Sequence, residues 1–154
     1  GSLSHLVGIP SGGSRIALAS EDIRNPLRQP HKLRMDGPAT FRAMIELLSD
    51  SVIPKAVKRA GLASLNEIDA IVFHQANLRI IDAIRERLKY RGVVPTNIEH
   101  YGNTTSASIP LCLSEALRGE DPRVREGMKV LLVAFGGGIT WATAIMKIGN
   151  LSYL

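Results

Sequence analysis

The sequence is poor in cysteine and in aromatic residues, and it contains no long apolar run. Its single cysteine, Cys112, cannot form a disulfide within the chain, and a zinc site built from several thiolates is excluded. One tryptophan, three tyrosines and three phenylalanines are too few for a platform on which nucleic-acid bases stack. Since no run of about 18 apolar residues and no signal-peptide pattern occurs, we expect a cytoplasmic protein that does not bind a membrane.

The remaining composition is that of an ordinary globular domain. Of the 154 residues, 45% are hydrophobic and 21% are charged, which suits one domain with one core. The net charge is +5, but the basic residues are scattered along the chain. This pattern favours a solvated, mildly basic surface over a nucleic-acid site.

The first 30 residues differ from the rest because loop-forming residues dominate them. The first two are typical of a remnant of tag cleavage, and residues 21–30 contain two prolines that predict an exposed connection. We therefore interpret residues 1–30 as a tag remnant plus a linker or the end of a preceding half. We expect the folded domain over residues 31–149 and a tail over residues 150–154.

Hydrophobic periodicity predicts strands that alternate with helices. In chain order we expect a strand over residues 31–35, a helix from about 38 that Pro54 kinks or restarts, a capped turn over 64–67, a strand over 68–73, a helix ending near 91, a short strand within 93–100, a helix over about 106–118, and strands over 129–135 and 141–148. This order predicts an α/β fold in which a mixed sheet carries helices on its faces, in α-β-α layers.

The most informative stretch is residues 70–80, where a short apolar run ends in polar side chains. His74, Gln75 and Asn77 follow the expected strand directly, and Asn77 can cap the helix behind it. Open α/β sheets bind ligands at the carboxyl ends of their strands, so His74 is the first candidate for a functional residue. Histidines at strand ends are also common as structural hydrogen-bond partners, and the residues alone leave both interpretations open.

Two further turns, at residues 102–105 and 136–140, are rich in polar residues and glycine. An imidazole from His74 and a carboxamide from Asn103 would offer hydrogen-bond donors to a carbonyl that gains negative charge, and glycine amides could add more. Taken singly, Asn103 is typical of a turn and the glycine triplet of a tight strand reversal. No Gly-x-Gly-x-x-Gly or Walker pattern supports a nucleotide site.

Four motifs occur together in a specific order and spacing. They are MDGPATF at residues 35–41, HQANLRI at 74–80, GNTTSASIP at 102–110 and FGGGITW at 135–141. Together they resemble the C-terminal signatures of β-ketoacyl-acyl-carrier-protein synthase III, a thiolase-superfamily enzyme, over about residues 30–149. The resemblance implies a thiolase-like fold of two similar halves, of which this chain is the C-terminal one.

The resemblance also implies an activity and a division of roles. Family enzymes condense an acyl group, taken from acyl-coenzyme A, with malonyl-acyl carrier protein, and they release carbon dioxide. On that pattern His74 and Asn103 are catalytic, because they would hydrogen-bond the malonyl thioester carbonyl and stabilise the enolate. The backbone amide of Gly137 would complete the oxyanion hole beside the nucleophilic cysteine.

The same resemblance implies residues that bind the substrate and the carrier protein. Phe135, Asn77 and Gly37 would line the substrate pocket. Arg79 and Arg42 would contact the acyl carrier protein. No metal and no separate cofactor are expected, since the substrates are acyl-coenzyme A and malonyl-acyl carrier protein.

The sequence departs from the family pattern at two places. Pro38 stands where many relatives carry an asparagine that reaches the pantetheine. The nucleophilic cysteine is absent, and Cys112 cannot replace it because its stretch corresponds to the helix behind the Gly-Asn turn. We therefore expect no activity from this chain alone. The expected partners are a missing N-terminal half that carries the cysteine, the acyl carrier protein, and a second copy of the full-length protein.

Three alternatives remain on the sequence alone. The first is a related acyltransferase or condensing enzyme of secondary metabolism. The second is a non-catalytic half that only completes a partner chain, although the presence of both His74 and Asn103 argues against it. A phosphate-binding module is the weakest alternative, since no phosphate loop occurs.

Overall fold

A computed structural model describes residues 3–11, 16–25, 32–119 and 124–150. The chain divides into two compact units, one of residues 1–42 and 136–140 and the other of residues 43–135 and 141–154. The two residues interpreted as a tag remnant lie outside the described residues. The domain boundaries expected near residues 30 and 150 stay predictions.

The first unit contains a two-stranded antiparallel sheet. Strand β1, Val7–Gly8, pairs with β2, Arg34–Met35. The start of the strand expected over residues 31–35 includes residue 31, which is not among the described residues. A short helix, α1, spans Ser20–Arg24, where we expected only an exposed connection.

Helix α2, Gly37–Leu47, begins in the first unit, directly after Asp36. The backbone N–H of Ala39 donates to Asp36 Oδ1 at 3.0 Å, and the N–H of Thr40 donates to the Asp36 carbonyl at 2.8 Å. Asp36 thus satisfies amide groups that lack a partner inside the first turn.

The helical segment changes its hydrogen-bond pattern before Pro54. A π-helical turn, η1, spans Leu48–Val52 and leads into helix α3, Ile53–Arg59. Pro54 lies in the first turn of α3, which follows η1 directly: Val52 keeps right-handed helical angles, and the Ile53 N–H donates to the Leu48 carbonyl. We expected Pro54 to kink the helix or to restart it. The chain stays helical from Gly37 to Arg59, so it does not restart at Pro54, and the kink stays a prediction.

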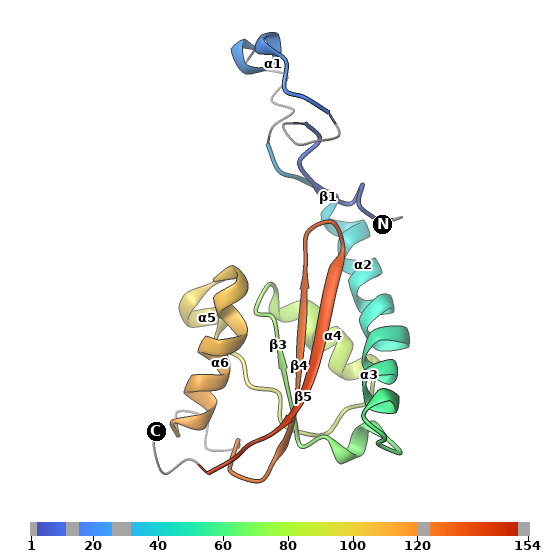
Figure 1. Cartoon of the computed structure of the whole chain (residues 1–154), viewed down its shortest axis with the longest axis vertical. Helices are drawn as coiled ribbons and strands as arrows, with labels where there is room; N and C mark the ends of the chain where they lie inside the picture. Colours follow the sequence, from blue (N-terminus) through green and yellow to red (C-terminus); the bar gives the residue numbers. More distant parts are fainter. Residues whose placement is uncertain (1–2, 12–15, 26–31, 120–123, 151–154) are drawn as a thin grey trace. The chain divides into compact units, whose positions relative to one another are not determined.

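The second unit is built around a mixed sheet in the order β3-β4-β5. Strand β3, Ala70–Phe73, is parallel to β4, Lys129–Gly136, with Ala70 opposite Val130 and Phe73 opposite Val133. Strand β5, Thr140–Lys147, neighbours β4 and is joined to it by residues 137–139, so the glycine triplet does reverse the chain (Figure 1).

The prediction of a strand within residues 93–100 was wrong. Val93 forms only an isolated bridge to Ala70, and helix α5, Ile98–Tyr101, follows. Pro95 lies between them, and proline cannot donate to a strand ladder. The chain beside β3 is therefore held by other bonds, described below.

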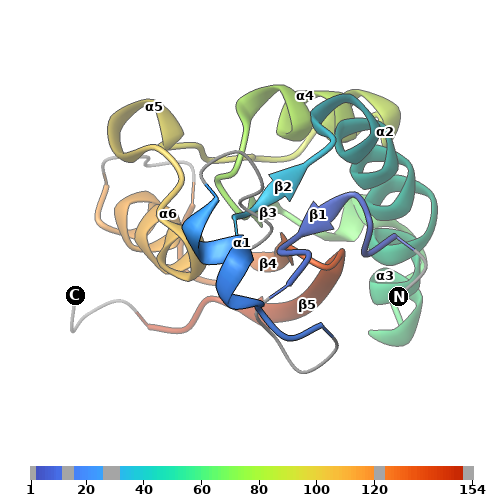
Figure 2. The same ribbon diagram turned by 90° about the horizontal axis from the view of Figure 1, so that it is seen from above.

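Helices cover both faces of this sheet. Helix α6, Ser108–Leu117, packs on one face, where Cys112 and Ala116 join Ala70, Val72 and Val130 in a buried apolar cluster. Helices α3 and α4, the latter spanning Leu78–Arg87, lie on the opposite side, as two views show (Figures 1 and 2). The expected α/β fold with a mixed sheet and flanking helices is confirmed.

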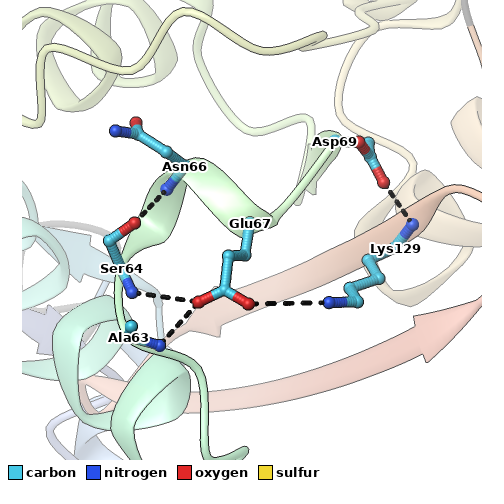
Figure 3. Close-up of polar contacts among 6 residues, drawn as sticks. All are labelled: Ala63, Ser64, Asn66, Glu67, Asp69 and Lys129. Carbon is cyan, nitrogen blue, oxygen red and sulfur yellow. Dashed lines mark hydrogen bonds and ion pairs between the residues drawn. The ribbon is translucent and has the colours of Figure 1, made fainter.

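A polar cluster fixes the entry to β3 (Figure 3). The turn η2, Leu65–Glu67, carries the expected capping box with Ser64. Glu67 Oε1 accepts from the N–H groups of Ala63, at 2.6 Å, and Ser64, at 3.3 Å, while its Oε2 lies 3.8 Å from Lys129 Nζ. The backbone N–H of Lys129 donates to Asp69 Oδ2 at 2.7 Å, so the starts of β3 and β4 are tied together.

Candidate active site

His74 lies where β3 ends. Its backbone N–H donates to the Val133 carbonyl at 2.9 Å, which continues the ladder with β4 by one residue. The preceding Phe73 is fully buried, whereas the His74 side chain is half-buried. The imidazole therefore lies at the carboxyl end of β3, just outside the buried core, as the sequence predicted.

Two contacts hold the His74 ring. Nδ1 lies 2.5 Å from Ser108 Oγ, at the start of α6. The ring also meets the Phe135 ring edge-on, with centroids 5.2 Å apart and an interplanar angle of 75°. Burial lowers the pKa of His74 below its ordinary value of 6.5, so the imidazole is neutral at pH 7.

Gln75, next to His74, holds the segments around the site together through three hydrogen bonds. Its Nε2 donates to the Phe73 carbonyl at 2.9 Å, its Oε1 accepts from the Asn97 N–H at 3.1 Å, and its own N–H donates to Ser108 Oγ at 3.2 Å. Asn97 Nδ2 in turn donates to Glu115 Oε2 at 2.7 Å. Hydrogen bonds from Tyr101 and Asn97 lower the pKa of Glu115, so this carboxylate is ionised at pH 7.

Asn103 lies in a tight turn in front of α6. Gly102 has a φ of 65°, and Asn103 Oδ1 accepts from the Thr105 N–H at 2.9 Å. Because that bond occupies the carboxamide oxygen, the Asn103 NH₂ group is left as a donor on an exposed side chain. In the described part of the chain, Asn103 and His74 share no direct bond. They are linked through the segment that leads from Asn103 to Ser108.

Asn77 caps α4, as the sequence predicted. Its Oδ1 accepts from the Arg79 N–H at 2.9 Å, so the carboxamide oxygen is used by the helix. Only the Asn77 NH₂ group is left to meet a substrate. Arg79 itself is exposed on the first turn of the helix.

The other three predicted site residues belong to the first unit. The Gly137 carbonyl accepts from Thr140 Oγ1 at 3.3 Å, and the following N–H, of Gly138, donates to the Val7 carbonyl at 3.1 Å. Gly37 and Arg42 lie in the first part of α2, and Arg42 is exposed. Their roles at the site stay predictions.

Cys112 is buried in α6, as expected of an inert thiol. Its side chain is 2% exposed, and Sγ donates to the Pro95 carbonyl at 3.4 Å. A thiol buried in this way is shielded from solvent and from a substrate that approaches through it. The described residues contain no group of three or more His, Cys, Asp or Glu arranged to hold a metal ion.

Sequence reasoning missed Ser108, Gln75 and Asn97 as parts of the site. Gln75 was noted only as a polar residue after the strand, and Ser108 only as part of a motif 34 residues away from His74 in the chain. A lone serine in front of an apolar run is typical of a helix start. Only the packing of α6 on β3 brings it to the imidazole.

Comparison with known proteins identifies the fold and the family. The model of a family described as 3-oxoacyl-[acyl-carrier-protein (ACP)] synthase III, C terminal, matches residues 57–148. The β-ketoacyl-[acyl-carrier-protein] synthase III of Symbiobacterium thermophilum is 39% identical over 145 residues, which cover 92% of this chain and 41% of that protein.

Solved structures give the same result. The 3-oxoacyl-(acyl carrier protein) synthase III of Pseudomonas aeruginosa superposes with a TM-score of 0.76 at 31% identity, over 97% of this chain and 42% of that one. The priming β-ketosynthase from the R1128 polyketide biosynthetic pathway gives a TM-score of 0.72 at 29% identity, over 97% and 42%.

The fold is therefore that of a thiolase-like condensing enzyme. The chain belongs to the 3-oxoacyl-[acyl-carrier-protein] synthase III family and corresponds to its C-terminal part. It spans about two fifths of the length of the curated relatives it matches, 41% and 44% in two of them. Among the described residues, no helix is both long and apolar enough to cross a bilayer.

Proposed function

We propose that this chain supplies the decarboxylation half-site of a 3-oxoacyl-[acyl-carrier-protein] synthase III. The full-length enzyme would condense acyl-coenzyme A with malonyl-acyl carrier protein to start fatty acid synthesis. Two observations support this proposal: a neutral imidazole at the end of β3 and, in the turn before α6, a carboxamide whose oxygen is held by a backbone N–H. His74 has a lowered pKa, and the Thr105 N–H holds the Asn103 carboxamide by its oxygen.

The chemistry needs such a pair. Loss of carbon dioxide breaks the bond between the malonyl carboxylate and C2, and its electron pair enters an enolate whose oxygen carries the charge. Two preorganised donors aimed at that oxygen lower the barrier, and neutral donors avoid attracting the substrate carboxylate to the wrong place. C2 of the enolate then attacks the acyl thioester and releases the thiol that had carried the acyl group.

The acyl acceptor would come from the missing part of the protein. The only cysteine of this chain is buried in α6, so a thiolate nucleophile has to be supplied by the N-terminal half. The isolated chain is accordingly inactive in condensation. Apart from this thiolate, the reacting groups belong to the two thioester substrates, and the proposed reaction uses no separate cofactor.

The remaining predicted residues would bind the substrates. Phe135, whose ring lies against His74, would flank the malonyl carboxylate, and the Asn77 NH₂ group and Gly37 would line the pantetheine channel. The Gly137 amide would join the oxyanion hole. Exposed Arg79 and Arg42 would attract the acidic carrier protein, and two copies of the full-length protein would form the working dimer.

The proposal is tested in the full-length protein that contains this chain. His74→Ala and Asn103→Ala should each slow release of carbon dioxide from malonyl-acyl carrier protein by roughly 10²–10³-fold. Transfer of the acyl group to the cysteine of the N-terminal half should continue in both variants. Asn66→Ala, at an exposed asparagine of η2, serves as the matched control. Undiminished carbon dioxide release in both site variants would refute the proposal.

A second candidate is a priming enzyme of secondary metabolism that uses the same half-site. The similarity to the R1128 priming β-ketosynthase supports it. Kinetics with a panel of acyl-coenzyme A donors and carrier proteins separate the two functions. A preference for a short acyl donor and the carrier protein of fatty acid synthesis supports the first function.

A further inference from the structure

The buried hydroxyl of Ser108 lies between the His74 ring and the backbone behind it. Its oxygen is 2.5 Å from His74 Nδ1 and 3.2 Å from the Gln75 nitrogen. Ser108 is only 1% exposed, so solvent does not compete for these bonds. One hydroxyl thus forms hydrogen bonds with two consecutive residues at the end of β3, His74 and Gln75.

A count of protons decides which way the short bond runs. The Gln75 N–H can only donate, so Ser108 Oγ accepts there. The hydroxyl still has its own proton, and Nδ1 of His74 is the nearby acceptor. If Nδ1 instead carried a proton, two donors would meet at one oxygen. The hydroxyl proton would then have no acceptor among the described residues, which is costly for a buried group.

The orientation of the ring is fixed by the same contacts. Rotating the imidazole by 180° would replace Nδ1 with a carbon and lose the bond to Ser108. It would also leave the hydroxyl proton unpaired. The edge-on contact with Phe135 holds the ring from another side. His74 Nε2 makes no hydrogen bond with any described residue, so it is available to a ligand.

We propose that Ser108 is a positioning residue, which holds His74 in the tautomer whose proton is on Nε2. The consequence for catalysis rests on the proposed function, in which that N–H donates to the enolate oxygen. A neutral imidazole with its proton on Nδ1 would present a lone pair to the same oxygen and repel it. Ser108 thereby determines whether the histidine helps or hinders the reaction.

The tautomer can be measured on this chain without any substrate. In a long-range ¹H–¹⁵N correlation spectrum of the chain labelled with ¹⁵N-histidine, the His74→Gln variant identifies the His74 signals among those of four histidines. We expect a protonated Nε2 and an unprotonated Nδ1 at pH 7.5. A protonated Nδ1 in the unmodified chain would overturn the proposal, and no variant is needed for that result.

Substitutions then test the cause. Ser108→Ala should shift the His74 ¹⁵N signals toward a mixture of tautomers, whereas Ser108→Thr, which keeps the hydroxyl, should retain the Nε2–H form. Ser106→Ala, at an exposed serine of the same motif, is the matched control and should change nothing. If Ser108→Ala leaves the tautomer unchanged, the proposal fails. Should the threonine variant fail to fold, Ser108→Cys replaces it as a weaker donor.

Activity separates this proposal from the function on which it rests. In the full-length protein, Ser108→Ala should lower kcat for malonyl decarboxylation with little change in KM, and Ser108→Thr should restore it. The loss should stay below the roughly 10²–10³-fold cost of removing a donor, because the correct tautomer is still partly populated. Suppose that His74→Ala is inactive but that the unmodified chain carries its His74 proton on Nδ1. That result would refute the role of Ser108 and leave the proposed function standing. Full activity in His74→Ala would refute the proposed function and leave the tautomer result intact.

Discussion

The carboxamide oxygen of Gln75 accepts a hydrogen bond from the backbone N–H of Asn97, at 3.1 Å. Gln75 is fully buried, and Asn97 is 5% exposed. This bond holds the segment behind Pro95 beside the end of β3, where no strand ladder exists. The residue next to the candidate catalytic histidine is therefore a structural support for the surrounding turn.

We predict that Gln75→Met destabilises the chain. Methionine has a similar length, but it leaves the Asn97 N–H buried without a partner, and such a loss costs about 1–3 kcal/mol. Urea unfolding should show a lower midpoint with an unchanged slope. Glu86→Met, at an exposed position of α4, is the control and should leave the midpoint nearly unchanged. Equal midpoints in both variants would show that the Gln75 bonds contribute nothing.

The lowered pKa of His74 predicts a pH dependence of stability. The pKa in the folded chain lies below the unfolded value of 6.5, because burial disfavours the imidazolium. Between these two values the unfolded state binds more protons, so the free energy of unfolding rises with pH. The contribution is fully present above about pH 6.5 and is lost as the pH falls toward the folded pKa.

The measurement compares urea midpoints of the chain and of His74→Gln between pH 5 and pH 8. The unmodified chain should lose more stability on acidification than the variant, which has no imidazole to protonate at this position. Parallel pH profiles for the two proteins would mean that the His74 pKa is the same in the folded and unfolded states.

Local sequence signals predicted the elements on which the site depends. The Ser64–Glu67 capping box and the Asn77 cap are both encoded within a few neighbouring residues. The polar turn after β3 likewise marked His74 directly. Such features depend on backbone groups close in the chain, and they form without information from the rest of the fold.

The missed features depend on residues far apart in the sequence. The contact between His74 and Ser108 joins two elements, and periodicity indicates the buried face of a helix but not which residues of another element that face meets. The strand expected near Val93 failed for a related reason. Its apolar residues fit a strand, but Pro95 interrupts the ladder and Asn97 bonds to the Gln75 side chain instead.

Gly92 is predicted to be intolerant of any side chain. A Cβ at this position would overlap the hydroxyl end of the Tyr90 ring and lie 2.8 Å from the Asp69 carbonyl oxygen. The ring cannot easily move, because Tyr90 is buried and its hydroxyl donates to the Ile68 carbonyl at 2.8 Å. Gly92→Ala should therefore destabilise the chain by about 1–3 kcal/mol, as overpacking does.

Thermal or urea unfolding checks this prediction against Gly149→Ala, where a Cβ meets no atom within 4 Å. The control should unfold at nearly the midpoint of the unmodified chain. In a double-mutant cycle, Tyr90→Leu should reduce the cost of Gly92→Ala, because the obstructing ring is gone. Additive effects would locate the strain elsewhere, at the Asp69 carbonyl.

The Glu67 carboxylate performs two tasks that a pair of substitutions can separate (Figure 3). One oxygen caps the turn by accepting from the Ala63 and Ser64 N–H groups, and the other lies 3.8 Å from Lys129 Nζ. Glu67→Gln keeps a capping oxygen and removes the charge, so it should cost little, since exposed ion pairs contribute little. Glu67→Ala removes the cap and should lower the free energy of unfolding by about 1 kcal/mol. If glutamine proves as destabilising as alanine in urea unfolding, the ion pair between Glu67 and Lys129, which joins η2 to the start of β4, is the dominant contribution.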